Sequence, residues 1–201
     1  DAIPQGSSMV LLSTSAAGYY GNGGEEEQTE VHSSGNGFLA RVCREWEAEA
    51  RRAEDKGARV AIMRFAVVMG KQGGALQTMK LPFQLGLGGP IGSGRQWFPW
   101  IHLQDLVAAA QFLLNCDQCH GPFNFTAPGA VRQIEFAKAL AGQLGRPSFF
   151  PAPAPLMKLG LGEFGESLLQ GQKVLPRALE EHGFVFSYPE LEQALRDLLH
   201  Q

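Results

Sequence analysis

The chain has 201 residues, of which 44% are hydrophobic, and it carries a formal net charge of −3 at neutral pH. This length and apolar content allow one folded domain or slightly more. The slight acidic excess argues against nucleic-acid binding, which needs a basic face. No apolar run of about 18 residues predicts a membrane span, and residues 1–8 do not resemble a signal peptide.

The first part of the chain predicts a strand, a helix and a second strand. Residues 9–15, MVLLSTS, form an apolar run that ends in hydroxyl residues, which is typical of a buried strand. Residues 20–37 are polar and glycine-rich, so we expect a loop. Residues 38–57 predict a helix whose apolar stripe comprises Leu39, Val42, Cys43, Trp46, Ala50 and Ala53. Residues 58–70 predict another buried strand, and this order indicates a parallel sheet and an α/β fold class.

Shorter elements follow Gly70. Residues 73–86 favour a short helix interrupted near Pro82, and residues 96–115 begin as an aromatic strand and become a helix near Leu103. The other expected elements are a glycine-rich loop at 87–94, a strand at 122–128, a helix at 131–145, a proline-rich connection at 151–158 and a helix at 188–200.

Two of the 3 cysteines, Cys116 and Cys119, stand in the string CDQCH. The C-x-x-C-H spacing is also that of covalent haem attachment. A metal site would need a further ligand pair, and no second Cys/His pair follows. An odd number of cysteines does not make a disulfide framework. We therefore predict a loop with reduced thiols, no bound metal and a cytoplasmic location.

A pyrophosphate-binding loop needs a glycine turn between a strand and a helix. Gly35-Asn36-Gly37-Phe38-Leu39-Ala40 fits G-x-G-x-x-A and opens the helix, but the residues before it are polar and acidic rather than strand-like. The glycines at 86–94 have the wrong spacing and include Pro90. The sequence therefore contains no convincing pyrophosphate site.

Several stretches together resemble the extended short-chain dehydrogenase/reductases. They are LLSTSAAGYYG, REWEAEA, VAIMRFAVVMG, LPFQLGLGGPIGSGRQWFPWIHLQDL, FNFTAPG and LLQGQKVLPRALEEHGFVFSYPELEQALRDLL. They are most similar to the atypical branch called nucleoside-diphosphate-sugar epimerase-like proteins. Members of that family are about half again as long and begin with a Rossmann unit that carries the glycine loop. The resemblance implies that this chain is the C-terminal two-thirds of such a protein. Residues 1–72 would complete the dinucleotide-binding domain and residues 73–201 would lie mainly on the substrate side, with 96–128 returning partly to the sheet.

The resemblance also implies where the nicotinamide lies. The strand at 9–15 would end beside it, with Ser15 as the hydroxyl that contacts or polarises the substrate and Thr14 as the alternative. Ser13, Thr14, Arg64 and Phe65 become candidates for cofactor contacts. For Ser13 the alternative is a structural hydroxyl at a strand end. For Arg64 the alternative is a charged residue that flanks a strand or pairs with a nearby carboxylate.

One departure from the family pattern concerns its Tyr-x-x-x-Lys pair, in which the tyrosine is the acid/base. Aligning Glu47 with the acidic residue that often follows this motif places Leu39 and Cys43 at the tyrosine and lysine positions, and neither can replace them. Tyr19 and Tyr20 are the phenols nearest to Ser15 in sequence and are candidate replacements. The alternative for Tyr20 is packing beneath the turn.

On the substrate side, the candidates are Lys80, Trp97, Trp100 and His102. The two tryptophans and Phe98 could line a pocket for a ring-shaped substrate, and core packing is the alternative. Lys80, like Arg95, could meet an anionic group, and a solvated charge is the alternative. His102 titrates in a useful range, and a structural pair with Asp105 is the alternative.

The resemblance implies an NAD(P)-dependent oxidoreductase or epimerase-like protein that acts on a nucleotide-sugar or another small carbonyl or hydroxyl substrate. NADP is slightly favoured over NAD as its cofactor. The alternative is a non-catalytic nucleotide-binding or redox-sensing protein, since a fold does not fix a function. We expect no nucleic-acid or membrane partner. An open edge of the strand at 9–15 would also allow a homodimer.

Overall fold

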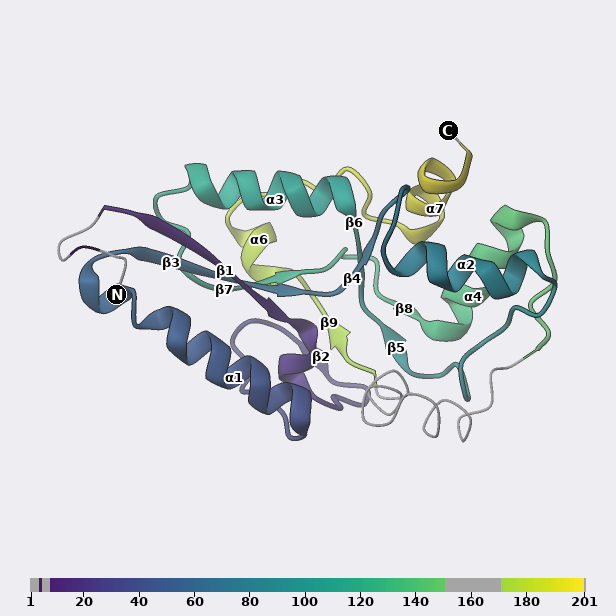
Figure 1. The fold of residues 1–201 in the computed structure, drawn as a ribbon, viewed down its shortest axis with the longest axis horizontal. Coiled ribbons are helices and arrows are strands. Elements are labelled where there is room, and N and C mark those ends of the chain that lie inside the picture. The colour runs from purple at the N-terminus through teal and green to yellow at the C-terminus, as the bar shows by residue number, and fades with distance from the viewer. Residues whose placement is uncertain (1–3, 5–7, 151–170, 201) are drawn as a thin grey trace.

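The computed structural model describes residues 4, 8–150 and 171–200. Its central feature is a three-stranded parallel sheet in the order β1-β3-β7 (Figure 1). These strands are β1 (Val10–Ala16), β3 (Arg59–Phe65) and β7 (Gly121–Phe125). The α/β fold class and the parallel pairing predicted from the sequence are confirmed.

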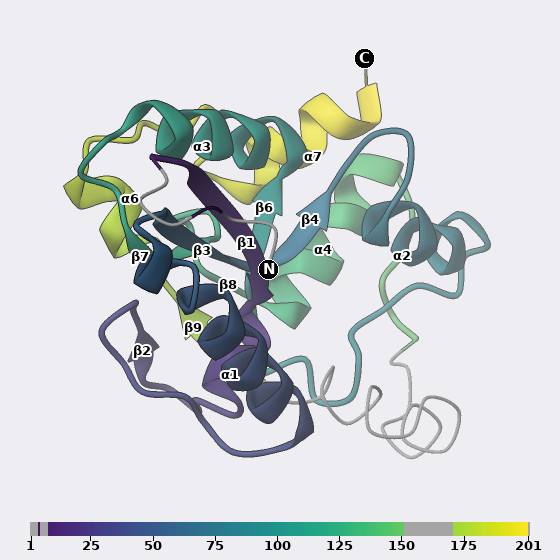
Figure 2. The same cartoon turned by 60° about the vertical axis from the view of Figure 1, so that its left-hand side comes forward.

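The sheet is covered on both faces. Helices α1 (Phe38–Arg51) and α3 (Leu103–Asn115) lie on opposite sides of it in both views (Figures 1 and 2). Because strand side chains alternate between the faces, the sheet residues that pack toward α3 are Ala61, Met63, Phe123 and Phe125. Val60 and Ile62 pack on the other face, against the end of α1.

Helix α1 buries or half-buries the predicted stripe with the exception of Trp46. Trp46 is 55% exposed, although helical spacing assigned it to the buried stripe. The buried residues of the helix are Ala40, Cys43 and Glu47. Small side chains let the helix lie close to the sheet, and Glu47 finds a charged partner there, so a carboxylate replaces the expected tryptophan in the interface.

The apolar run at 58–70 forms two strands instead of one. After β3, the Ala66 N–H donates to Phe125 O, and the chain continues as β4 (Val67–Met69). Strand β4 pairs in parallel with β6 (Trp100–His102) rather than with β1 or β7. One apolar run therefore contributes a strand to each of two sheets and connects two parts of the fold.

The second part gathers around α4 (Gln133–Leu144) and α7 (Leu191–His200), at the right of Figure 1. Strand β5 (Trp97–Phe98) pairs antiparallel with β8 (Val131–Arg132). Helix α2 (Ala75–Gln84) contains Pro82 and ends two residues after it. The core of this part includes Leu76, Phe98, Trp100, Phe136, Leu140 and Leu195.

The remaining helices and strands are short. Strand β2 (Glu27–Gln28) lies within the predicted loop and pairs in parallel with β9 (Lys173–Val174). Helix α6 (Arg177–Glu181) follows and packs against the central sheet through Leu179. The 3-10 turns are η1 (Ala17–Tyr20) and η2 (Glu54–Lys56). The predicted connection at 151–158 lies outside the described residues.

The prediction of reduced thiols at Cys116 and Cys119 is wrong, because a disulfide joins them. The turn after α3 brings their Cα atoms to 5.3 Å, a separation that a disulfide can span. Cys43 is a free, buried thiol. No helix within residues 8–150 and 171–200 is both long enough and apolar enough to cross a membrane.

Gly35, the first glycine of the G-x-G-x-x-A string, has a packing role. Its N–H donates to Tyr19 O at 2.9 Å, and a Cβ built on Gly35 would lie 2.1 Å from Tyr20 O. The backbone of the 20–37 segment therefore touches η1 so closely that only glycine fits.

We predict that Gly35→Ala lowers the free energy of unfolding by about 1–3 kcal/mol or more, because the new methyl group must displace backbone. Gly142→Ala is the matched control: Gly142 lies in α4 with open space around its Cβ position. That change should be neutral or stabilise the protein by up to about 1 kcal/mol. Urea unfolding measures both, and equal effects of the two changes would contradict the close approach.

Candidate functional site

Three polar side chains form one row across the central sheet. Ser15 pairs with Arg64 in the β1–β3 register, and Arg64 pairs with Asn124 in the β3–β7 register. All three lie near the carboxyl ends of their strands. Open parallel sheets bind their ligands at that edge, so this row is the strongest candidate for a site.

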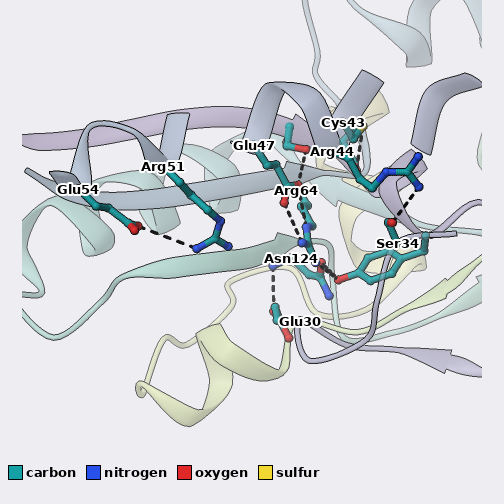
Figure 3. Close-up of polar contacts among 12 residues, drawn as sticks. Glu30, Ser34, Cys43, Arg44, Glu47, Arg51, Glu54, Arg64 and Asn124 are labelled. Atoms are coloured by element: carbon teal, nitrogen blue, oxygen red, sulfur yellow. Dashed lines mark hydrogen bonds and ion pairs between the residues drawn. The ribbon is translucent and has the colours of Figure 1, made fainter. Parts of the chain in front are cut away.

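Glu47 of α1 connects the first two members of the row (Figure 3). Ser15 Oγ donates to Glu47 Oε1 at 2.7 Å. Arg64 donates to both oxygens of the same carboxylate, from Nε at 2.9 Å and from Nη2 at 2.8 Å. The Arg64 and Glu47 side chains are only 2% and 5% exposed. This is a buried bidentate ion pair, in which each charged group is stabilised by the other.

The network continues to β7 through Tyr20. Arg64 Nη1 donates to Tyr20 Oη at 2.8 Å, and Tyr20 Oη donates to Asn124 Oδ1 at 2.7 Å. Asn124 Nδ2 donates to Leu175 O at 2.9 Å, and the Asn124 backbone N–H donates to Glu30 Oε1 at 2.8 Å (Figure 3). Side chains from the helix, the sheet and the 20–37 segment are therefore joined without a break.

The charges of this network follow from burial. Burial raises the pKa of Tyr20 to about 12, although the charge of Arg64 pulls it down. Burial alone would lower the pKa of Arg64, but Glu47 and Tyr20 outweigh it and the pKa rises. Burial raises the pKa of Glu30, against the hydrogen bond from Asn124. Near neutral pH Arg64 is a cation and Tyr20 a neutral phenol.

The two candidate tyrosines differ in their surroundings. Tyr20 is 3% exposed, and its hydroxyl both accepts from Arg64 and donates to Asn124. These bonds favour a positioning role over proton transfer. The Tyr19 ring lies against the Arg64 guanidinium, with Cζ 3.5 Å from the ring centroid. Tyr19 is partly exposed, and none of the hydrogen bonds among the described residues uses its hydroxyl.

The other predicted nicotinamide-side residues lie beside the row. Ser13 is half-buried and precedes Ser15 by two residues, so it points to the same face of the sheet. Thr14 points to the opposite face and is exposed. Phe65 packs on Phe125, with ring centroids 5.3 Å apart, in the core beneath α3. Cofactor contacts by these residues and by Arg64 stay predictions.

Leu39 of α1 lies against η1, and Cys43 lies against the last residue of β1. A Cβ built on Gly18 would lie 3.3 Å from Leu39 Cβ. The Cys43 thiol donates weakly to Ala16 O at 3.8 Å. That these two residues occupy the positions of the Tyr-x-x-x-Lys pair stays a prediction.

The predicted substrate-side residues do not join this network. Trp100 is buried in the second core, where Nε1 donates to Gly129 O at 3.1 Å. Trp97 is half-buried beneath the guanidinium of Arg132, whose Cζ is 3.8 Å from the ring centroid. Lys80 lies half-buried on α2. Substrate contacts by these residues stay predictions.

His102 is the last residue of β6 and the N-cap of α3, and it is 2% exposed. Its Nδ1 accepts from the Gln104 N–H at 3.1 Å, and its ring stacks on Tyr188 with centroids 3.9 Å apart. Nε2 lies 3.3 Å from Asp197 Oδ2, so the predicted partner Asp105 is replaced by Asp197. Asp105 accepts from the backbone of residues 187 and 188 instead. Burial lowers the pKa of His102, against the nearby carboxylates.

Sequence reasoning missed three members of the network. Glu47 served only to align the helix, yet it receives bonds from Ser15 and Arg64. Asn124 interrupts two buried phenylalanines in FNF, and this single polar residue in a strand was a usable signal. Glu30 carries no local signal, because its partner Asn124 lies 94 residues away in sequence.

We predict that Glu47→Ala lowers the free energy of unfolding by about 3–5 kcal/mol, because it leaves the Arg64 charge buried without its partner. Glu49→Ala is the control: Glu49 pairs with Arg52 on the exposed side of the same helix, and an exposed pair contributes at most about 1 kcal/mol. The double change Glu47→Leu with Arg64→Met should recover much of the loss. Chemical denaturation measures the free energy of unfolding of each variant. A loss below about 1 kcal/mol for Glu47→Ala would contradict the ion pair.

Comparisons with known proteins agree with this architecture. Residues 2–124 match the NAD dependent epimerase/dehydratase family, and residues 152–198 match DUF1731, a domain of unknown function. An epimerase family protein of Staphylococcus aureus (strain N315) is 43% identical over 191 residues, which are 94% of this chain and 64% of that protein. The chloroplastic SDR39U1 homologue of Arabidopsis thaliana is 46% identical over 190 residues, 94% of this chain and 54% of that protein.

Solved structures give the same result. Human epimerase family protein SDR39U1 (isoform 2) with NADPH is 38% identical, with a TM-score of 0.91 over 96% of this chain and 65% of that chain. A nucleoside-diphosphate sugar epimerase from Corynebacterium glutamicum is 33% identical, with a TM-score of 0.79 over 95% of this chain and 37% of that chain. UDP-glucose 4-epimerase from Thermus thermophilus with NAD, at 16% identity and a TM-score of 0.75 over 96% of this chain and 63% of that chain, shares the fold.

The chain thus spans 64% of the length of the Staphylococcus aureus relative and 65% of the human structure. The resemblance found in the sequence is confirmed, since the family match covers residues 2–124, more than half of the 201 residues. This protein belongs to the NAD dependent epimerase/dehydratase family.

Proposed function

We propose that this chain supplies the nicotinamide and substrate side of an NAD(P)-dependent oxidoreductase or epimerase-like enzyme. Its substrate would be a nucleotide-sugar or another small carbonyl or hydroxyl compound. The observation that carries the proposal is the row formed by Ser15, Arg64 and Asn124 at the carboxyl ends of three parallel strands. Within that row, Ser15 is the half-buried hydroxyl, and a buried carboxylate holds it in place.

The hydrogen bond to Glu47 orients the Ser15 hydroxyl. A carboxylate accepts only, so the Ser15 proton points to Glu47 and the remaining lone pairs of Oγ are free for a ligand donor. A substrate hydroxyl can donate to Oγ in this arrangement. A substrate carbonyl would need the Ser15 proton to turn away from a charged acceptor, which costs about 1.5–3 kcal/mol. The ground state therefore favours the alcohol form of a substrate.

The described residues fit one half of a dinucleotide site. A bound dinucleotide would take up or release hydride, and the chain's residues would orient the substrate oxygen. Gly35 packs against the backbone of Tyr20, so we do not assign it to phosphate binding. Because the chain covers 64% of the Staphylococcus aureus relative, we propose that the phosphate-binding half lies outside this sequence. The human relative was solved with NADPH, which favours NADP(H) here.

A second function, nucleotide binding without catalysis, rests on the apolar positions of α1. Leu39 cannot move a proton, and Cys43 is a buried thiol that contacts Ala16 O. The Tyr20 phenol is held by two bonds. In this alternative the network holds α1, η1 and the sheet together but performs no chemistry.

We predict that the full-length gene product binds NADPH more tightly than NADH, measured by fluorescence titration. Ser15→Ala should leave NADPH affinity within about threefold and lower turnover about 100-fold or more, the range typical of a lost polarising or proton-transfer group. Ser8→Ala, at an exposed serine just before β1, is the control and should leave both quantities unchanged. Turnover is followed with sugar nucleotides, aldehydes and ketones together with the corresponding alcohols.

Absence of NAD(P)H binding by the full-length protein would overturn both functions. Binding without turnover of any compound in the panel would support the second. The 201-residue chain alone should bind NADPH weakly or not at all, and a micromolar dissociation constant would contradict the proposed missing half. Among the described residues β1 has a strand partner on one side only, so this shorter chain should also tend to dimerise through that edge.

The pKa of Tyr20 gives a test of its positioning role. In the folded protein this pKa is about 12, above the ordinary 10.0, so the folded state holds the phenolic proton longer than the unfolded state. Stability from this group is complete below pH 10 and is lost as pH rises toward 12. We predict that the free energy of unfolding falls by about 1 kcal/mol more between pH 9 and pH 11 in the parent protein than in Tyr20→Phe. Equal slopes would show that the pKa of Tyr20 is not raised and would contradict its burial in the network.

A further inference from the structure

The Cys116–Cys119 disulfide lies at the turn between α3 and β7. Cys116 directly follows the last residue of α3, and Cys119 precedes the first residue of β7 by two positions. The Cys119 N–H donates to Cys116 O at 3.1 Å. The backbone turn that brings the two sulfurs together is therefore also held by a hydrogen bond of its own.

The two cysteines differ in burial. Cys119 is 0% exposed and belongs to the core with Leu113 and Phe123. Cys116 is partly exposed, and the neighbouring Asp117 and Gln118 are exposed. An external thiol can therefore approach the disulfide only at Cys116, while Cys119 must leave into the core.

Arg59 of β3 holds the same turn through hydrogen bonds to backbone carbonyls. Its Nη1 donates to Leu113 O at 2.9 Å and to Cys119 O at 2.8 Å, and its Nη2 donates to Leu114 O at 3.0 Å. These bonds do not involve the sulfurs, so they persist when the S–S bond is broken. Two thiols kept in one fixed turn can re-form their disulfide, which is the condition for a reversible couple.

We propose that Cys116 and Cys119 form a reversible thiol–disulfide exchange site, with a dithiol protein or small dithiol as its reductant. The thiolate of the reductant attacks Cys116 Sγ, the S–S bond breaks, and Cys119 leaves with the electron pair and takes up a proton. The second thiol of the reductant then displaces Cys116, giving two protein thiols and an oxidised reductant. The reverse reaction with an external disulfide restores the bond. This site is independent of the proposed function.

The exchange acts on the beginning of β7. Reduction frees the turn that leads into Gly121, and Asn124 of the polar network lies three residues further along the same strand. The disulfide closes a very short loop, so reduction should lower Tm by roughly 4–8 °C. The oxidised form is thus the more rigid support for the sheet.

The test uses single-cysteine variants in a Cys43→Ala background. With oxidised glutathione under native conditions, Cys119→Ser leaves Cys116, which should form a mixed disulfide at least about tenfold faster than Cys119 does in Cys116→Ser. Intact-mass measurement follows both reactions, and unfolding in urea should abolish the difference. Equal native rates would overturn the assignment of Cys116 as the attacked sulfur.

Reversibility is tested on the chain with both cysteines. In graded ratios of reduced to oxidised dithiothreitol, alkylation and mass measurement should show molecules with no label or with both Cys116 and Cys119 labelled, at equal fractions from either starting state. A disulfide that is reduced only in urea would overturn the proposal. Tm should fall on reduction in this chain and stay constant in Cys116→Ser/Cys119→Ser; a Tm unaffected by reduction would overturn the effect on β7.

Discussion

The buried ion pair between Arg64 and Glu47 is the constraint on which the rest of the site depends. A guanidinium in the middle of a parallel sheet must be paired, because an isolated buried charge is very costly. The pairing requires α1 to bring Glu47 within 2.9 Å of Arg64. It also uses three nitrogens of the guanidinium, two on Glu47 and one on Tyr20.

Once this pair is formed, the geometry of its neighbours follows. Glu47 Oε1 also accepts a hydrogen bond from the Ser15 hydroxyl, which fixes that hydroxyl at the end of β1. Arg64 donates to the Tyr20 oxygen, and the Tyr20 hydroxyl donates to Asn124 Oδ1, which can only accept. The ion pair therefore fixes the direction in which the Ser15 hydroxyl donates. It also keeps the Tyr20 hydroxyl in hydrogen bonds, so that this phenol is not available as an acid. Structural and chemical roles are linked through single hydrogen bonds rather than through shape alone.

The sequence predicted those parts of the fold that depend on local pattern. The β1-α1-β3 unit and the stop of α4 at Gly145, which is left-handed as a C-cap, follow from periodicity and glycine chemistry. Ser15 and Arg64 could be placed at strand ends, but their common partner Glu47 could not, because periodicity assigns a glutamate to solvent and Trp46 to the core. The division of residues 58–70 at Ala66 depends on pairing with Phe125, and the disulfide depends on the tightness of one turn.

Helix α1 carries Glu47 of the ion pair and the two residues that we predict at the Tyr-x-x-x-Lys positions. Cys43 and Glu47 lie one turn apart on its buried face. Glu47 supplies the charge that organises the polar network, whereas Leu39 and Cys43 supply no acid, base or cation. Because the ion pair involves neither of these two residues, the network keeps its form whether or not the protein performs hydride chemistry. Similarity of fold and the presence of the ion pair therefore carry no information about activity. The question of catalysis rests on Ser15, the network's partly exposed hydroxyl, and on what donates to its oxygen.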